Sequence, residues 1–84
     1  MDFKKLRGLL DESYQWPDYY EFKFIIKTSE KHRVKELLLE FKLTETLSKN
    51  GKYTSVSAKK LIHKTEEILE IYELVSKIEG VISL

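Results

Sequence analysis

A run of basic side chains is the first group whose types and spacing could do chemistry: Lys59, Lys60, His63 and Lys64. It lies where a predicted strand leads into a predicted helix. A helix N-terminus presents unpaired N–H groups and a positive dipole end, so a phosphate or carboxylate could bind there. Glu66 and Glu67 follow at once, and their carboxylates satisfy the same dipole. We therefore treat the run as a candidate anion site, with a solvated surface as the alternative.

A second candidate lies in the stretch "SKNGKYTSVSAKK", residues 48–60. Its Asn-Gly pair is a strong hairpin signal, and small polar residues alternate after Tyr53. An exposed strand aromatic is also what RNA-recognition modules use to stack a base. Such modules need more than one aromatic, but Ser55 occupies the next position on the same face. An RNA-binding module is therefore the alternative function, and an ordinary hairpin tyrosine is the plain interpretation.

Metal and catalytic chemistry are not expected. The two histidines, His32 and His63, are far apart in sequence, and the chain has no cysteine. The three glycines are explained by a helix, a turn and a helix stop (Gly8, Gly51, Gly80). Ferredoxin-like acylphosphatases need arginine and glycine in the loop after the first strand, and this loop reads "KTSEK". We predict no metal, no cofactor and no enzymatic activity.

Composition indicates one folded domain. The chain has 84 residues, of which 42% are hydrophobic and 35% are charged. The net charge of +1 balances 15 basic against 14 acidic residues, so no overall field recruits nucleic acid or membrane. Nucleic acid and membrane are therefore not the expected partners. No apolar run approaches the roughly 18 to 20 residues of a membrane span, and a cytoplasmic location is predicted.

The elements that must position these residues follow from hydrophobic spacing. Apolar residues at helical intervals predict a short first helix that ends near residues 11–14, a helix over 28–41, and a last helix that stops at Gly80. Aromatic and β-branched residues predict a strand over 19–27, and alternation predicts two hairpin strands around the Asn-Gly pair. The tail "VISL" is a short final strand.

This order is a helix followed by β-α-β-β-α-β, the α+β ferredoxin-like plan. We expect a two-layer sandwich in which two helices cover one face of a four-stranded antiparallel sheet. Residues 1–84 form a single domain, with the N-terminal helix over 1–14 and the core over 19–84. The first helix should fold back onto this domain, with Trp16 and Pro17 sealing the junction. The predicted core residues are Phe22, Phe24, Val34, Leu38, Val56, Ile71 and Val75.

A two-residue turn at Asn50 and Gly51 sets the hairpin register and sorts the side chains by face. The helix-covered side receives Leu43, Leu47, Val56 and Ala58, and also Glu45, an inward charge that discourages edge-to-edge aggregation. The open side receives Thr44, Thr46, Ser48, Tyr53, Ser55 and Ser57. Together with the first strand, this predicts a candidate binding face of Lys23, Ile25, Tyr53, Ser55 and Ser57.

Three segments resemble the YbeD-like family of small bacterial proteins: "WPDYYEFKFIIKT", "SKNGKYTSVSA" and "IYELVSKIEGVISL". The most specific part is the hairpin, where the turn glycine, Tyr53 and the "SVS" of residues 55–57 match the family pattern. Tyr72, Lys77 and Ile78 follow in the last helix. The resemblance covers nearly the whole chain. One departure is His63, which stands where the family usually has a capping threonine.

The resemblance implies an ACT-like version of the ferredoxin-like fold and, through gene neighbourhood, a regulatory link to lipoate metabolism. It implies no catalytic or binding residues. Amino-acid-binding ACT domains use a glycine in the loop after the first strand, which "KTSEK" lacks. We therefore expect a non-catalytic binding or regulatory domain. Its partner would be a second copy, another protein or a small effector, held at the open sheet face or the sheet edges.

Overall fold

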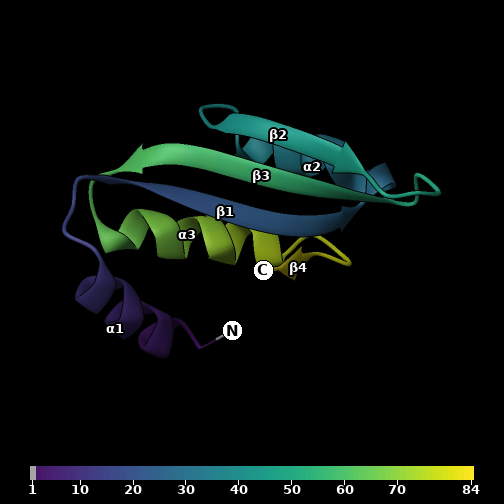
Figure 1. Ribbon diagram of the computed structural model, residues 1–84. Helices are drawn as coiled ribbons and strands as arrows, with labels where there is room; N and C mark the ends of the chain where they lie inside the picture. The colour runs from purple at the N-terminus through teal and green to yellow at the C-terminus, as the bar shows by residue number, and fades with distance from the viewer. Residues whose placement is uncertain (1) are drawn as a thin grey trace.

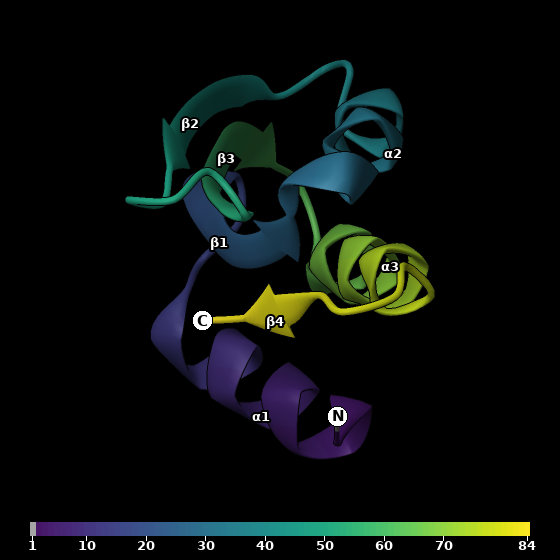
Figure 2. The same cartoon turned by 90° about the vertical axis from the view of Figure 1, so that its right-hand side faces the viewer.

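The computed structural model describes residues 2–84 and has the predicted α+β ferredoxin-like architecture (Figure 1). The four strands form one antiparallel sheet in the order β2-β3-β1-β4. Helices α2 and α3 cover one face of this sheet, and α1 lies beside α3 (Figure 2). The elements are α1 (Phe3–Ser13), β1 (Asp18–Lys27), the 3-10 turn η1 (Thr28–Glu30), α2 (Lys31–Leu37), β2 (Lys42–Leu47), β3 (Tyr53–Ile62), α3 (Thr65–Ser76) and β4 (Ile82–Ser83).

The core lies between the sheet and the two covering helices. Even-numbered residues of β1 point into it, because side chains alternate along a strand, and Phe22, Phe24 and Ile26 are fully buried. The predicted core residues are buried with one exception, Ile71, which is only partly buried. Ile71 lines a gap in the helix layer.

The hairpin register is the predicted one, but its turn is different. Leu43 pairs with Ala58, and Glu45 pairs with Val56. A two-residue type I′ turn needs positive φ at both central residues, whereas only Gly51 has it, with φ 74°. The loop is instead residues 49–52, closed by the backbone bond from Ser48 N to Tyr53 O at 2.8 Å. Both turns are centred between Asn50 and Gly51, so the cross-strand pairs are unchanged.

Two further details differ from expectation. The helix predicted over 28–41 begins with η1 and ends at Leu37, and the chain then turns so that the Phe41 ring packs 5.7 Å from the Phe22 ring. Leu47, predicted to lie under the helices, is 59% exposed. It is the last residue of edge strand β2, so it has a strand neighbour on one side only.

Glu45 points to the helix side as predicted, and α2 supplies its partners. The Nζ atoms of Lys35 and Lys31 lie 2.8 and 3.2 Å from its carboxylate oxygens. Hydrogen bonding from Lys35 is the largest effect and lowers the pKa of Glu45; partial burial opposes it, and hydrogen bonding from Lys31 adds to the lowering. The inward charge therefore ties the edge strand to the helix layer.

We expect Glu45→Gln to lower the free energy of unfolding at pH 7 by about 1 kcal/mol or less, the range of exposed ion pairs. Because the folded-state pKa lies below the ordinary 4.5, the contribution is complete above pH 4.5 and is lost as pH falls through the folded value. Urea titrations between pH 7 and pH 3 should show the parent and the variant converge. Glu36→Gln, which removes an exposed α2 carboxylate, is the control; an equal loss there would contradict the assignment to Glu45.

Helix α1 folds back onto the domain, as predicted, and it packs beside α3. Leu10 is buried in the core, and Phe3 and Leu6 pack against it. At the junction, the Trp16 ring stacks on Tyr14 with 4.8 Å between ring centroids. The helix is therefore part of the folded unit.

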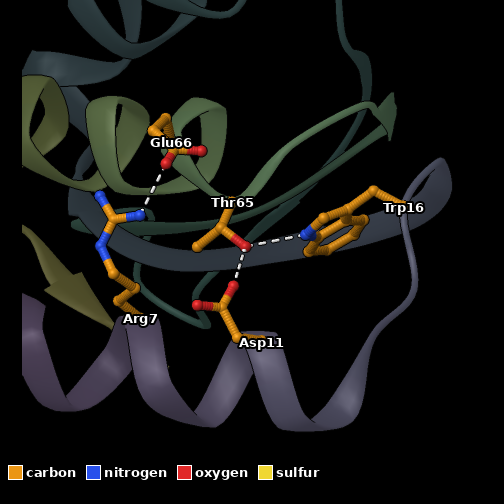
Figure 3. Close-up of polar contacts among 5 residues, drawn as sticks. All are labelled: Arg7, Asp11, Trp16, Thr65 and Glu66. Atoms are coloured by element: carbon orange, nitrogen blue, oxygen red, sulfur yellow. Dashed lines mark hydrogen bonds and ion pairs between the residues drawn. The ribbon is translucent and has the colours of Figure 1, made fainter.

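Polar contacts complete the α1–α3 junction (Figure 3). The buried hydroxyl of Thr65 accepts a hydrogen bond from Trp16 Nε1 at 2.8 Å and donates one to Asp11 at 2.6 Å. Arg7 pairs with Glu66 at 2.6 Å, which lowers the pKa of the Glu66 carboxyl. One threonine thus links α1, the turn before β1 and the start of α3.

Candidate binding face on the open side of the sheet

The face of the sheet away from α2 and α3 is built in cross-strand rows. In one row Ile25 lies between Ile82 of β4 and Ser55 of β3, and Thr46 of β2 follows. In the next row Lys23 pairs with Ser57. Side chains at these positions share a face because successive residues of a strand alternate. The structure therefore brings together Lys23, Ile25, Ser55 and Ser57 as the sequence predicts, with Tyr53 one row beyond.

The centre of this face is a shallow hollow of about 230 Å³. The small side chain of Ser55 lies beside Ile25 across the strands and two residues from Tyr53 along β3, and Thr46 lies next to it on β2. The exposed walls of the hollow are largely carbon, although most of its residues carry a hydroxyl. The lining residues are Ile25, Thr46, Leu47, Ser48, Tyr53 and Ser55. The hollow therefore offers apolar contact to an occupant, with hydroxyls at its border.

Charges lie beside the hollow. The Nζ atom of Lys23 lies 3.7 Å from a carboxylate oxygen of Glu21 on the same strand, and both side chains are well exposed. Lys52 Nζ lies 5.8 Å from the centroid of the Tyr53 ring, a cation–π contact at the hairpin end. Tyr53 pairs with Lys27 across the strands, so no second aromatic ring lies opposite it. This row does not supply the pair of aromatics that base stacking on two strands requires.

The candidate face named from the sequence leaves out four residues of this surface. Thr46, Leu47 and Ser48 line the hollow, and Ile82, which is 54% exposed, extends the apolar surface beyond Ile25. The predicted hairpin register had already placed Thr46 and Ser48 on the open side. The position of Ile82 depends on the pairing of β4 with β1. A strand of two residues is too short for its pairing to be predicted from the sequence.

The four basic residues of the candidate anion site do not converge. Lys59 points to the open side, where its Nζ lies 5.5 Å from the centroid of the Tyr19 ring. Lys60 points to the helix side and pairs with Glu40 at 3.2 Å. Consecutive strand residues must diverge in this way. Glu67 also accepts the backbone N–H of His63, so a carboxylate of the chain occupies part of the helix start beside Lys64.

The most strongly shifted titratable group lies away from this face. Burial, followed by a 2.9 Å hydrogen bond with the Tyr20 hydroxyl, raises the pKa of the Tyr72 phenol. The phenol of Tyr72 therefore stays protonated and joins β1 to α3. Its role is in packing, where its ring lies 5.1 Å from that of Phe22.

Residues 2–84 contain neither a candidate metal-binding cluster nor a candidate membrane-spanning helix. No three or more His, Asp or Glu side chains of this range come close enough to hold a metal ion. Over the same residues, no helix combines the length and apolar character that a bilayer crossing requires.

Residues 11–84 match a family described as "Protein of unknown function (DUF493)". The chain belongs to this family. The matched region begins near the end of α1, so most of that helix lies outside it. The fold is similar to the solution structure of protein HP0495 from H. pylori, a structural genomics target, with 27% identity and a TM-score of 0.71. The similarity covers 86% of each chain. No curated protein matches this chain.

Proposed function

We propose that this chain is a non-catalytic binding domain whose open sheet face holds a partner. The proposed surface is Lys23, Ile25, Tyr53, Ser55 and Ser57, extended by the hollow between Ile25 and Tyr53. The observation that carries the proposal is this hollow, because it places apolar surface in water on the face of the sheet opposite α2 and α3 (Figure 2).

The chemistry of the face favours a partner with apolar side chains. Ile82 lies beside Ile25, and covering both would remove a continuous apolar strip from water. Tyr53 has the type of side chain that often dominates binding energy at interfaces. The serine and threonine hydroxyls can pair with backbone groups or water at the border. A second copy of this chain and another protein both fit this description, and so does a small apolar effector.

The finer parts of the proposal are an ACT-like regulatory role in the bacterial cytoplasm and a link to lipoate metabolism. Their support is the resemblance to the YbeD-like family. A direct test is titration with lipoic acid while the amide resonances of Ile25 and Ser55 are followed by NMR. Saturable shifts confined to the hollow would support a lipoate-like effector. Unchanged spectra would remove this effector and leave the protein-partner version.

We expect Tyr53→Ala to weaken self-association or partner binding and to leave the melting temperature nearly unchanged. Tyr53 is 38% exposed, so its loss opens no cavity in the core. Light scattering over a concentration series would detect a change of oligomeric state, and affinity capture from lysate would detect loss of a partner.

Tyr19→Ala is the matched control, because Tyr19 is an exposed tyrosine at the other end of the same face. Equal effects of both substitutions would point to general surface adhesion. Identical masses and captured partners for the parent and Tyr53→Ala would remove the proposed role of the hollow. An RNA mobility shift that weakens as salt rises, with retention on heparin, would favour the RNA-binding alternative, since phosphate binding depends on counterion release.

A further inference from the structure

A second concave surface lies on the helix side of the sheet, opposite the proposed binding face. Because α2 ends at Leu37, it leaves part of β3 and α3 uncovered. The gap is a groove of about 190 Å³. Phe41, Ile62, Ile71 and Leu74 form its apolar surface, and Lys60, Glu67 and Glu70 complete its lining. Ile71 is only partly buried because it belongs to this groove.

The rim of the groove is predominantly acidic. Glu67 and Glu70 lie on the α3 side. Lys60 is the basic residue of the lining, and its charge is paired with Glu40 at 3.2 Å. Lys60 also lies over the Phe41 ring, 5.3 Å from the centroid. Glu70 makes no salt bridge within residues 2–84. The net charge around the apolar floor therefore complements a cation.

Basic groups also lie near the groove: the exposed Lys42 follows Phe41, and the exposed Lys77 lies three residues after Leu74. His63 and Lys64 stand at the start of α3, where the backbone of His63 already donates to Glu67. Glu70 lies three residues further along α3 than Glu67.

The end of α2 and the loop that leads into Phe41 also expose apolar surface, since Leu37 is 37% exposed and Leu39 is 81% exposed.

We propose that this groove binds a basic amphipathic helix of a partner protein. Apolar side chains of that helix, spaced three and four residues apart, would enter the groove beside Ile71 and Leu74. Lysine or arginine side chains at its border would pair with Glu67 and Glu70. A helix fits because α3 supplies Glu67, Glu70, Ile71 and Leu74 to the groove, so the occupant would pack beside α3. In helix-in-groove binding, apolar side chains at this spacing enter the groove. The site is separate from the open face and does not depend on the function proposed there.

The probe is a synthetic helical peptide with leucine on one face and lysine on the other, labelled for fluorescence anisotropy. A peptide with the same leucines and glutamate for lysine is its control. We expect the lysine peptide to bind, and binding to weaken as salt rises. The double variant E67Q/E70Q should bind about threefold to tenfold more weakly, since two exposed ion pairs are lost. NMR shifts should map to Ile71, Leu74 and Phe41.

Glu73→Gln is the matched variant, because Glu73 is an exposed glutamate of the same helix that does not line the groove. It should leave the affinity within about twofold. Three outcomes would overturn the proposal: no binding of the lysine peptide, equal losses in Glu73→Gln and E67Q/E70Q, or shifts that map to the open face. Tyr53→Ala should bind the peptide normally, so failure here is distinguishable from failure of the open-face function. Circular dichroism of each variant checks that it remains folded.

Discussion

Replacing Phe22 with alanine should lower the free energy of unfolding by about 3 to 5 kcal/mol, the usual cost of removing a buried phenylalanine. Phe22 has no exposed surface, and its ring contacts those of Tyr20, Phe24, Phe41 and Tyr72 at centroid distances of 4.9 to 6.0 Å. These rings come from β1, α3 and the turn before β2. A cavity here would therefore loosen the sheet and its helix layer together.

This loss is large relative to the free energy of unfolding of a domain this small, which is about 5 to 10 kcal/mol. Urea unfolding followed by circular dichroism measures it. Lys23→Ala is the matched control, because the neighbouring Lys23 side chain points to the open face and is 57% exposed. It should change stability by about 0.5 kcal/mol or less. Similar losses in both variants would mean that the assigned alternation of β1 is wrong.

Thr65→Val should destabilise the protein by about 1 to 3 kcal/mol, although the two side chains have nearly the same shape. The substitution leaves Trp16 Nε1 without its acceptor and removes the donor to Asp11. Because Thr65 is only 3% exposed, water cannot readily replace its hydroxyl. We expect α1 to separate from α3 before the rest of the chain unfolds.

The fluorescence of Trp16 reports this separation directly, since it is the single tryptophan of the chain. Its emission should shift to longer wavelength at lower urea concentration in Thr65→Val than in the parent. Thr44→Val, at an exposed position of β2, is the control and should leave both emission and stability nearly unchanged. If Thr65→Val behaves like this control, the junction in Figure 3 does not hold α1 in place.

Local patterns predicted the order of the elements and the core because they depend on short-range chemistry. Alternation placed Phe22 and Phe24 inside, and the symmetry of the hairpin set its register even though the turn type was wrong. The last helix, however, ends at Ser76, before the predicted stop at Gly80, although Gly80 does have the positive φ of 75° that favours glycine. The same hairpin register placed Tyr53, Ser55 and Ser57 on the candidate binding face, and alternation along β1 placed Lys23 and Ile25 there.

Where local patterns failed, contacts between distant segments decided the outcome. The helix pattern of 28–41 continues to Phe41, yet the helix ends at Leu37 and Phe41 packs on Phe22. Tertiary packing can override local helix propensity in this way. The basic residues of the run at 59–64 are close in sequence, yet side chains alternate along β3, so Lys59 and Lys60 point to opposite faces. Lys60 forms an ion pair with Glu40.

The sequence by itself determined the ferredoxin-like order, the faces of the strands and the inward position of Glu45, since each follows from periodicity and one turn. Only the tertiary structure decided three other features. These are the partners of Thr65, the pairing of Ile82 with Ile25, and the groove beside Ile71. Each depends on where segments far apart in the chain meet, and such meetings are selected by the packing of the whole domain rather than by any local pattern.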